Sequence, residues 1–414
     1  MNYLAKTDNL FFITSLPLGA FLISGGLVVL CWSPNVLGND QITCWALIIP
    51  WMLLGPLTYF NLFSSKEFRT EIVLLLTIII FGIINIVFSD NPARTYPTMR
   101  MFLLTGVITL WTSMFLLAGR QPRQLFDWFC CGCLAIIALT EILACYHKSP
   151  NAQGLCNIFT LHSIPLGSLI ILLSPGPFRL LGAADLKWKA AGCLLLALGV
   201  FLITLTGKRS TFWVIVAMCL FWVYFRAGRW SFLAAVALVT VTLLVPKGLN
   251  FYKSLHRDIP SHNSIFHRLE LYPFSLHVYL KHPVAGIGLR SLTHEKYLAD
   301  FPRHNSNLQT FQPTVKQLQT FDNMLLTAFV ELGTPMTLAY LALTVFILRR
   351  YWQRLRPLAR SPGLELYRLL VVLGFAVHSL AYDSMLFPSV NWLFHVQLGI
   401  LAGYGLNRTP ASLT

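Results

Sequence analysis

Long apolar runs, separated by short polar or charged stretches, follow one another along nearly the whole chain. A helix needs about 20 mostly apolar residues to cross the roughly 30 Å hydrocarbon core of a bilayer. We therefore place twelve membrane-spanning helices near residues 10–32, 42–63, 71–88, 101–119, 124–145, 157–173, 188–206, 210–225, 231–246, 323–348, 364–382 and 391–407. The pattern predicts an all-α integral membrane protein.

One long polar stretch interrupts this pattern. Residues 247–322 separate nine predicted spans in 1–246 from three in 323–414. Within this loop, residues 265–283 alternate apolar and polar positions in a way compatible with an amphipathic helix lying in the membrane interface. The alternative is a lid that only covers the bundle.

Composition agrees with a membrane protein and changes how the charge is interpreted. The chain has 414 residues, of which 56% are hydrophobic and 11% charged, against about 25% charged residues in soluble domains. The formal net charge is +15. A nucleic-acid-binding protein gathers Lys and Arg on one face, whereas here they punctuate the apolar runs, so we expect no nucleic-acid partner.

The basic residues are spread unevenly over the connections between spans. Alternate connections carry most of them, including Lys66, Arg69, Arg120, Arg123, Arg179, Lys187, Arg226, Arg229 and the cluster from Arg349 to Arg360. Short loops rich in Lys and Arg stay in the cytoplasm. This asymmetry predicts cytoplasmic N- and C-termini and a periplasmic loop 247–322. That loop is itself basic and polar, which is typical of a binding site for an anionic ligand.

The sequence lacks nucleotide-binding motifs and metal-binding cysteine patterns, which limits the reactions that the chain could catalyse. The chain has no GxxxxGK[ST] sequence, no GxGxxG after a strand and no large cytoplasmic domain that could hold a nucleotide. Cys130, Cys131 and Cys133 lie inside an apolar run, where such side chains pack, so we predict no metal site. An outward-facing enzyme without nucleotides needs a substrate that arrives already activated, and a lipid diphosphate is the natural form.

Two arginines are candidates to bind that diphosphate. Arg209 follows Lys208 in the very short connection between spans 188–206 and 210–225, which the topology puts at the outer surface. A guanidinium offers a planar fork of donors that suits phosphate oxygens. The alternative is an interfacial anchor whose charged head reaches the headgroups. The second candidate is Arg268, at the start of the amphipathic stretch.

A carboxylate stands where the loop returns to the membrane. Asp322 and Asn323 precede the apolar run that begins at Met324. Asp322 is placed to accept a proton from a sugar hydroxyl at the bilayer surface. Asp is also a preferred N-cap residue, so Asp322 is equally a candidate cap for the helix that begins there.

Three blocks of these residues resemble the O-antigen ligase and polymerase superfamily of bacterial envelope glycosyltransferases. The blocks are 206–210 (Thr-Gly-Lys-Arg-Ser), 268–288 (from Arg268 to the turn Pro-Val-Ala-Gly-Ile-Gly) and 322–333 (Asp-Asn-Met-Leu-Leu through Glu-Leu-Gly). Their order and the topology of about twelve spans with one large late periplasmic loop, a GT-C-like arrangement, match the family.

The resemblance implies transfer of a glycan from undecaprenyl diphosphate to an acceptor hydroxyl at the periplasmic face of the bacterial inner membrane, with inversion and without cofactor or metal. Arg209 and Arg268 would hold the diphosphate and Asp322 would act as the base. The family usually has histidine at the position of Asp322, so His304, which precedes an upstream asparagine, is kept as the reserve base.

The remaining candidates would contact substrate. Lys208, Arg290 and Asn323 are candidates for phosphate or acceptor contacts, and the predicted external loop 89–94 contributes Asp90 and Arg94. Asp90 is the runner-up base, although an aspartate beside asparagine and proline is more often a turn former.

Three functions remain open. A ligase would use lipid A-core as acceptor, and a polymerase would use another lipid-linked repeat unit. A polysaccharide flippase or transporter would carry out no covalent step and would need polar residues at mid-membrane depth, for which Glu141 and Arg368 are among few candidates.

Overall fold

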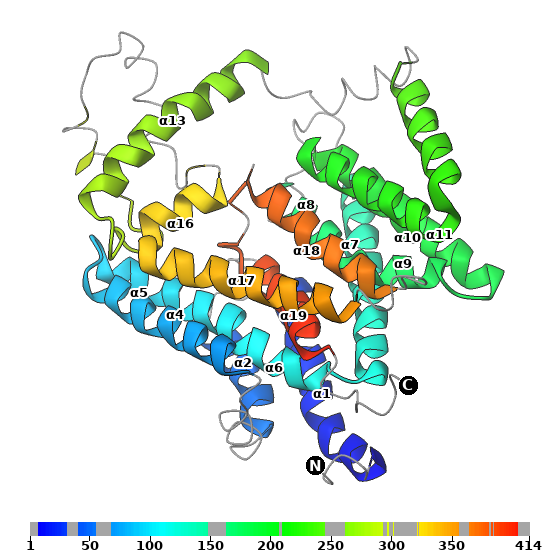
Figure 1. The fold of residues 1–414 in the computed structure, drawn as a ribbon, viewed down its shortest axis with the longest axis horizontal. Helices are drawn as coiled ribbons and strands as arrows, with labels where there is room; N and C mark the ends of the chain where they lie inside the picture. The colour runs from blue at the N-terminus through cyan, green and yellow to red at the C-terminus, as the bar shows by residue number, and fades with distance from the viewer. Residues whose placement is uncertain are drawn as a thin grey trace.

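The computed structural model describes residues 7–30, 40–54, 68–147, 163–206, 209–244, 261–292, 296–297, 301, 321, 323–355, 364–380, 382–383 and 385–404. Within these ranges the regular elements are helices and none is a strand, as predicted (Figure 1). In chain order they are α1 (Thr7–Leu30), α2 (Asp40–Leu53), α4 (Arg69–Val87), α5 (Pro92–Leu103), the π-helix η2 (Leu104–Ile108), α6 (Thr109–Leu116), α7 (Arg120–His147), α8 (Ser163–Leu173), α9 (Pro175–Leu181), α10 (Leu186–Thr206), α11 (Arg209–Leu244), α13 (Ser261–Lys281), α16 (Met324–Leu332), α17 (Thr334–Leu355), α18 (Leu364–Ser379) and α19 (Pro388–Gly403).

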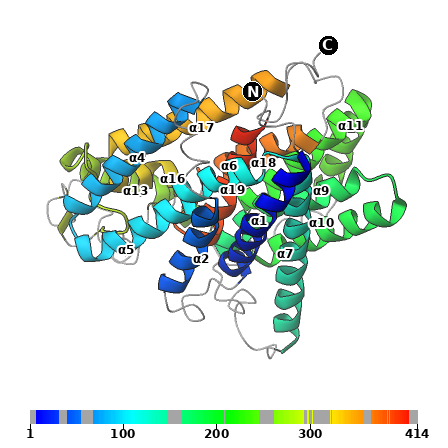
Figure 2. The same cartoon turned by 90° about the horizontal axis from the view of Figure 1, so that it is seen from below.

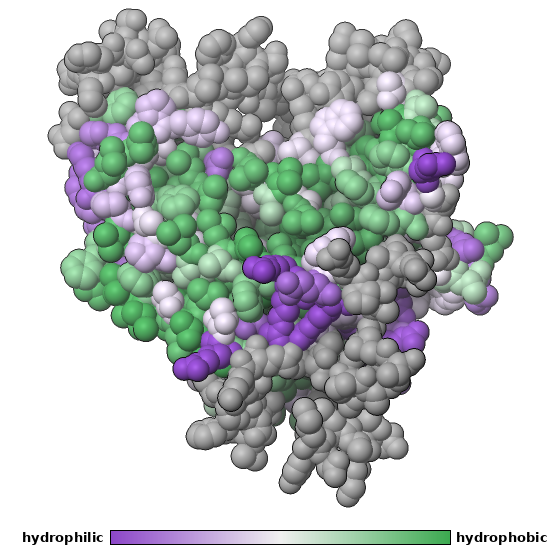
Figure 3. Space-filling model, in the orientation of Figure 1, coloured by the Kyte–Doolittle hydropathy of each residue, from purple (hydrophilic) through white to green (hydrophobic). Residues whose placement is uncertain are grey.

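Several helices are apolar enough to lie in a membrane. Among the described residues, four are also long enough to cross one, namely Arg69–Val87, Pro92–Leu116, Arg120–Glu141 and Leu186–Ile203, and four shorter apolar helices accompany them. On α4, an exposed stripe of Val73, Leu76, Ile80, Ile83 and Val87 recurs at helical spacing. Figure 3 shows a broad hydrophobic band across one face. The chain is therefore a multi-pass membrane protein.

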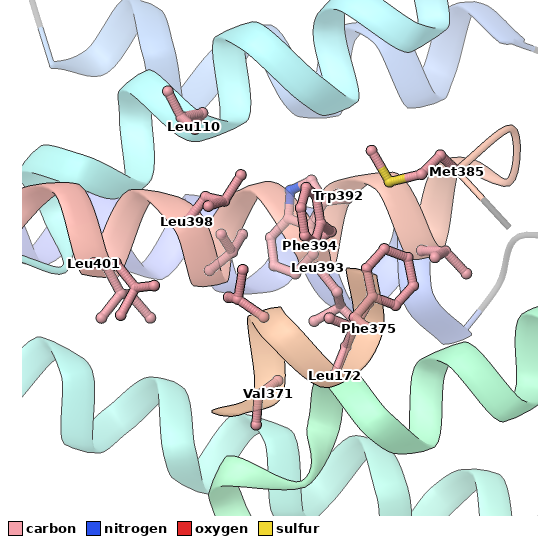
Figure 4. Close-up of a cluster of buried hydrophobic side chains, with 14 of the residues drawn as sticks. Leu110, Leu172, Val371, Phe375, Met385, Trp392, Leu393, Phe394, Leu398 and Leu401 are labelled. Carbon is pink, nitrogen blue, oxygen red and sulfur yellow. The ribbon is translucent and has the colours of Figure 1, made fainter. Parts of the chain in front are cut away.

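Helix α19 forms the centre of the bundle. Every residue from Pro388 to Gly403 is buried, and the helix packs against α1, α6, α8, α17 and α18. Figure 4 shows Trp392, Phe394 and Leu398 of this helix among apolar side chains from its neighbours. A Cβ at Gly399 would lie 1.9 Å from Ser113 Oγ, so glycine is what lets α6 approach so closely.

Two layers lie beside this centre. Helices α4 and α17 pack side by side, as both views show (Figures 1 and 2). Helix α13 packs against α16 at one end of the molecule (Figure 1). Its buried face carries Leu271, Phe274 and Val278, at the spacing of an amphipathic helix. A helix therefore covers most of the stretch 265–283, where an amphipathic helix was predicted.

The structure corrects two predicted spans. The span 323–348 is broken at Gly333 into α16 and α17, because Gly333 has φ +78° and Pro335 follows it in the first turn of α17. The span 101–119 begins earlier, at Pro92, so Arg94 lies in a helix rather than in a loop. The predicted spans 210–225 and 231–246 correspond to the two helices on either side of a kink at Gly228, with φ +85°, within α11.

Candidate functional site

The segment His282–Leu292, which we name the glycine loop, joins the second and third sequence blocks through its backbone. Ile287 N donates to Val330 O (3.0 Å) and Gly288 N donates to Glu331 O (3.1 Å). Thr334 N donates to Pro283 O (2.9 Å). The two blocks lie about 40 residues apart in sequence and form one unit at the end of the bundle near α13.

Three glycines make this junction possible. Gly286, Gly288 and Gly333 have φ of +68°, +97° and +78°, in the left-handed region that favours glycine. A Cβ on Gly286 would lie 2.3 Å from Glu331 O, and one on Gly333 would lie 2.1 Å from Val284 O. The Gly-x-Gly and Glu-x-Gly patterns therefore fit together because each gives the other's backbone room.

Asn85, near the end of α4, forms hydrogen bonds to both sides of the same junction. Its Nδ2 donates to Ala285 O (2.7 Å) and to Glu331 O (2.6 Å), and its Oδ1 accepts from Leu289 N (3.3 Å). The side chain is fully buried. A buried amide satisfied on both sides fixes the position of the two blocks relative to the membrane-spanning α4.

Three hydroxyls join the glycine loop to the start of α5. Ser89 Oγ lies 2.6 Å from Thr95 Oγ1 and 2.7 Å from Ser291 Oγ, and Thr95 Oγ1 lies 2.5 Å from Ser291 Oγ. Thr95 and Ser291 are buried. This hydroxyl cluster holds Arg94, the neighbour of Thr95, beside the loop.

Asp90 is engaged by the chain that follows the loop. Its Oδ1 accepts from Lys296 Nζ (2.8 Å), and its Oδ2 accepts from the phenol of Tyr297. Burial and this hydrogen bond raise the pKa of Tyr297 above its ordinary value, so the phenol keeps its proton and remains the donor. The Asp90 carboxylate therefore clamps residues 296–297 over the turn between α4 and α5.

Arg290 and Glu331 form the charged centre of this region. Arg290 N donates to Glu331 Oε2 (2.9 Å), and Arg290 has φ +56°, the one positive value among the described non-glycine residues. Strained backbone of this kind clusters at functional sites. Arg290 Nε and Glu331 Oε1 are buried and make no hydrogen bond to the described residues. Asp383, which repels a carboxylate, and Arg94, which attracts one, are the other charges acting on Glu331.

The end of α18 connects this centre to the block that contains Arg209. His378 Nδ1 lies 3.0 Å from Ser210 Oγ, and His378 Nε2 lies 3.0 Å from Ser168 Oγ of α8. Ser210 is the neighbour of Arg209 in the sequence. Asp383 follows His378 by five residues, which span at most about 18 Å. The start of α11 and the Glu331 centre therefore lie at the same end of the bundle.

The predicted site residues fall into three groups. The structure describes the side chains of Asp90, Arg94, Arg290 and Asn323. Arg209 begins α11 and Arg268 lies within α13, but their side chains are outside the described atoms. Lys208, His304 and Asp322 lie outside the described residues. Of the predicted site residues, Arg94 and Arg290 both act electrostatically on Glu331.

The predicted helix cap moves by one residue. Asp322 was a candidate N-cap, but α16 begins at Met324 and Asn323 caps it, with Oδ1 accepting from Leu326 N (3.1 Å). Asn323 has the extended backbone that an N-cap needs. The Asn323 side chain is thus used by the helix, which leaves Asp322 without the capping role.

Sequence reasoning missed Asn85, Glu331, His378 and Asp383 as site residues. Asn85 and His378 are polar residues within apolar runs, and this is the signal that could have found them. Glu331 had been noted only as part of a motif. Among the described residues no three His, Cys, Asp or Glu side chains gather in a way that could hold a metal ion.

Fold and site together define a multi-pass helical membrane protein with a charged centre at one end of its bundle. Residues 194–341 match the family model Wzy_C, described as O-antigen ligase. The resemblance stated above is confirmed over this segment, which runs from α10 into α17 and contains the glycine loop and Glu331. Asn85, Asp90, Arg94, His378 and Asp383 lie outside the matched segment and contact it or act on it. No curated protein matches the chain.

Proposed function

We propose that this protein transfers a glycan from undecaprenyl diphosphate to an acceptor hydroxyl at the periplasmic face of the bacterial inner membrane. The family match supports lipid-linked glycan transfer of the ligase or polymerase type. The observation that carries the proposal is the Arg290–Glu331 centre, where a strained arginine is held inside the matched segment with buried polar atoms that have no described partner. Such a centre is suited to an anionic substrate.

The proposed step is a single displacement. The acceptor oxygen forms a bond to the anomeric carbon as the bond from that carbon to the diphosphate oxygen breaks, which inverts the anomeric centre. The hydroxyl proton passes to the carboxylate of Asp322, with His304 as the reserve base. Arg209 and Arg268 bind the diphosphate and stabilise the negative charge that it gains on leaving.

The other residues assist this step. Arg290, Lys208 and Arg94 supply further positive charge to the diphosphate or the acceptor, and Asn323 fixes the start of α16 next to Asp322. Asp90 keeps its place in the site as a positioning residue, because its two carboxylate oxygens already bind Lys296 and Tyr297.

A turnover assay tests the proposal. Purified protein in detergent is given undecaprenyl-diphosphate-linked glycan and an acceptor, and release of undecaprenyl diphosphate is measured. We expect Arg209→Ala, Arg268→Ala and Asp322→Asn each to lower turnover by about 100-fold, the scale of losing one transition-state contact. Arg349→Ala, an exposed arginine of α17, is the control. Turnover by Arg209→Ala equal to wild type would contradict the mechanism.

A deletion strain separates the acceptors. We propose lipid A-core, in which case loss of the protein leaves bare core while lipid-linked polymer accumulates. If the acceptor is instead another lipid-linked repeat unit, loss leaves core capped by a single repeat. A flippase would leave repeat units facing the cytoplasm and would give no turnover in detergent. The pattern on a lipopolysaccharide gel distinguishes the first two outcomes.

A further inference from the structure

A second charged site lies away from the proposed transfer site. A cavity of about 530 Å³ is bounded by the starts of α7, α10 and α18, by α9 and by the middle of α11. Its volume falls within the range of small-ligand sites. The wall includes four arginines and several large aromatic rings, a combination that the proposed transfer mechanism does not use.

The cavity and the transfer site lie at opposite ends of the bundle. Arg368, in the first turns of α18, lines the cavity, whereas His378 in the last turn of the same helix contacts the block that contains Arg209. A 16-residue helix is roughly 24 Å long. The connections at the cavity end are those whose Lys and Arg content predicts a cytoplasmic location.

The charges of the cavity leave a positive excess. Asp127 binds Arg368 and Arg179, the latter at 3.2 Å, and Glu365 lies 3.1 Å from Arg123. With Arg120, four arginines face two carboxylates, a difference of two positive charges. Arg120 is exposed and makes no ion pair with the residues that the structure describes. The cavity therefore favours an anion.

The aromatic rings favour an anion that belongs to a lipid. Trp128 of α7 and Trp188 of α10 meet edge to face, with ring centroids 5.0 Å apart. They are 43% and 39% exposed. Membrane proteins place exposed indole rings at the level of the lipid head groups. Leu186 and Leu194 of α10 are also exposed and offer apolar surface for acyl chains.

We propose that this cavity binds the phosphate head group of an anionic phospholipid from the leaflet opposite the transfer site. Basic pockets between helices on the cytoplasmic side are known to take such head groups. Arg120, which lines the cavity and has no ion pair with the residues that the structure describes, is placed to face the phosphate, and the Trp128–Trp188 pair covers the start of the acyl chains. The bound lipid ties α7, α9, α10 and α18 together.

The test uses the full chain in neutral detergent and measures bound lipid by native mass spectrometry. The probes are phosphatidylglycerol, phosphatidylcholine with the same acyl chains, and soluble glycerol phosphate. We expect phosphatidylglycerol to bind about tenfold more tightly than phosphatidylcholine. Arg120→Ala is expected to weaken phosphatidylglycerol binding about fivefold, the effect of one basic side chain near a lipid phosphate. Trp188→Ala is expected to weaken it as well.

Arg349→Ala is the matched control, because Arg349 is an exposed arginine at the same end of the bundle but does not line the cavity. It should bind phosphatidylglycerol as wild type does. Equal binding of the two lipids, or an equal loss with Arg349→Ala and Arg120→Ala, would overturn the proposal. Glycerol phosphate binding as tightly as phosphatidylglycerol would identify a site for soluble anions instead. None of these results depends on glycan transfer.

Discussion

The two ends of the bundle hold their charges by different means. At the end near α13, the Glu331 carboxylate accepts a backbone N–H from Arg290, and the backbone around both is fixed by glycines and by Asn85. At the opposite end, Asp127 is held by the side chains of Arg179 and Arg368. In the first case backbone geometry positions the charge, and in the second the charges position one another.

This difference separates charges that are prepared for the transfer step from the ion pairs of Asp127, which hold helices together beside the proposed lipid cavity. A guanidinium used in an ion pair has little capacity left for substrate, whereas one fixed through its backbone keeps its side chain for binding. The Arg290 end should therefore be sensitive to small backbone changes. The Asp127 end should respond mainly through stability.

The largest effect is expected from Gly286→Ala. The new Cβ would lie 2.3 Å from Glu331 O at φ +68°, so the glycine loop must move away from α16. A displacement of about 1 Å near a reacting group can lower a rate about 100-fold. Turnover per folded molecule should fall by at least that factor, with a lower unfolding temperature.

Gly132→Ala is the control for this substitution. Gly132 lies within α7, and a Cβ there meets nothing within 4 Å. Helix propensity predicts a small gain of up to about 1 kcal/mol and unchanged turnover. If Gly286→Ala kept wild-type turnover, the glycine loop would have no role in positioning the site.

The next largest effect is expected from Arg368→Ala, at the end of the bundle that contains Asp127. Arg368→Ala leaves Asp127, a buried carboxylate, with Arg179 alone. Breaking a buried ion pair costs about 3–5 kcal/mol, so the free energy of unfolding should fall by about that amount. Turnover per folded molecule should change less than about twofold. Thermal unfolding and turnover are measured on the same sample.

The double variant Asp127→Leu with Arg368→Leu sharpens this result. Replacing both members of a buried pair with apolar residues is often close to neutral, and Arg179, whose side chain is 24% exposed, can reach water. Stability should recover by most of the loss. Reduced turnover in the stable double variant would mean that this end also takes part in transfer.

At Arg290 we expect a smaller effect, and one that raises rather than lowers the free energy of unfolding. Arg290→Gly removes a side chain from a residue at φ +56° and relieves strain of about 1 kcal/mol, so stability should rise. If the side chain contacts substrate, turnover should fall about 30-fold. Arg290→Ala keeps the strain and loses the same contact. Equal turnover in all three proteins would show that only the backbone of Arg290 matters.

Much of the fold follows from the sequence because apolar runs bounded by charges have few solutions in a bilayer. The helices at 71–88, 124–145, 188–206 and 364–382 appear where they were predicted, within a few residues. The break at Gly333 was not predicted, although the sequence Leu-Gly-Thr-Pro contains both signals of a helix end. The apolar residues on both sides of this sequence made α16 and α17 look like a single membrane span.

The candidate site was predictable only in part. The sequence identified Arg290 as a candidate and the third motif block contained the Glu-x-Gly pattern. The hydrogen bond of Asn85 to Glu331 and the charge of Asp383 acting on Glu331 join residues that are far apart in the chain. No local pattern records such pairings. The same holds for His378, whose contacts with Ser210 and Ser168 depend on how three helices pack.

The smallest effect is expected from Tyr297→Phe, which removes the hydrogen bond to Asp90 and leaves the ring in place. A hydrogen bond to a charged group contributes about 1.5 kcal/mol. Because the native pKa of Tyr297 is raised above its ordinary value near 10, this contribution is fully present below about pH 10 and declines as the pH rises further.

Unfolding temperatures of both proteins between pH 6 and 11 should therefore differ by a constant amount up to about pH 9 and converge above about pH 10. A difference that grew with pH would mean that the phenol loses its proton more readily in the folded protein, and the clamp over the α4–α5 turn would then rest on Lys296 alone.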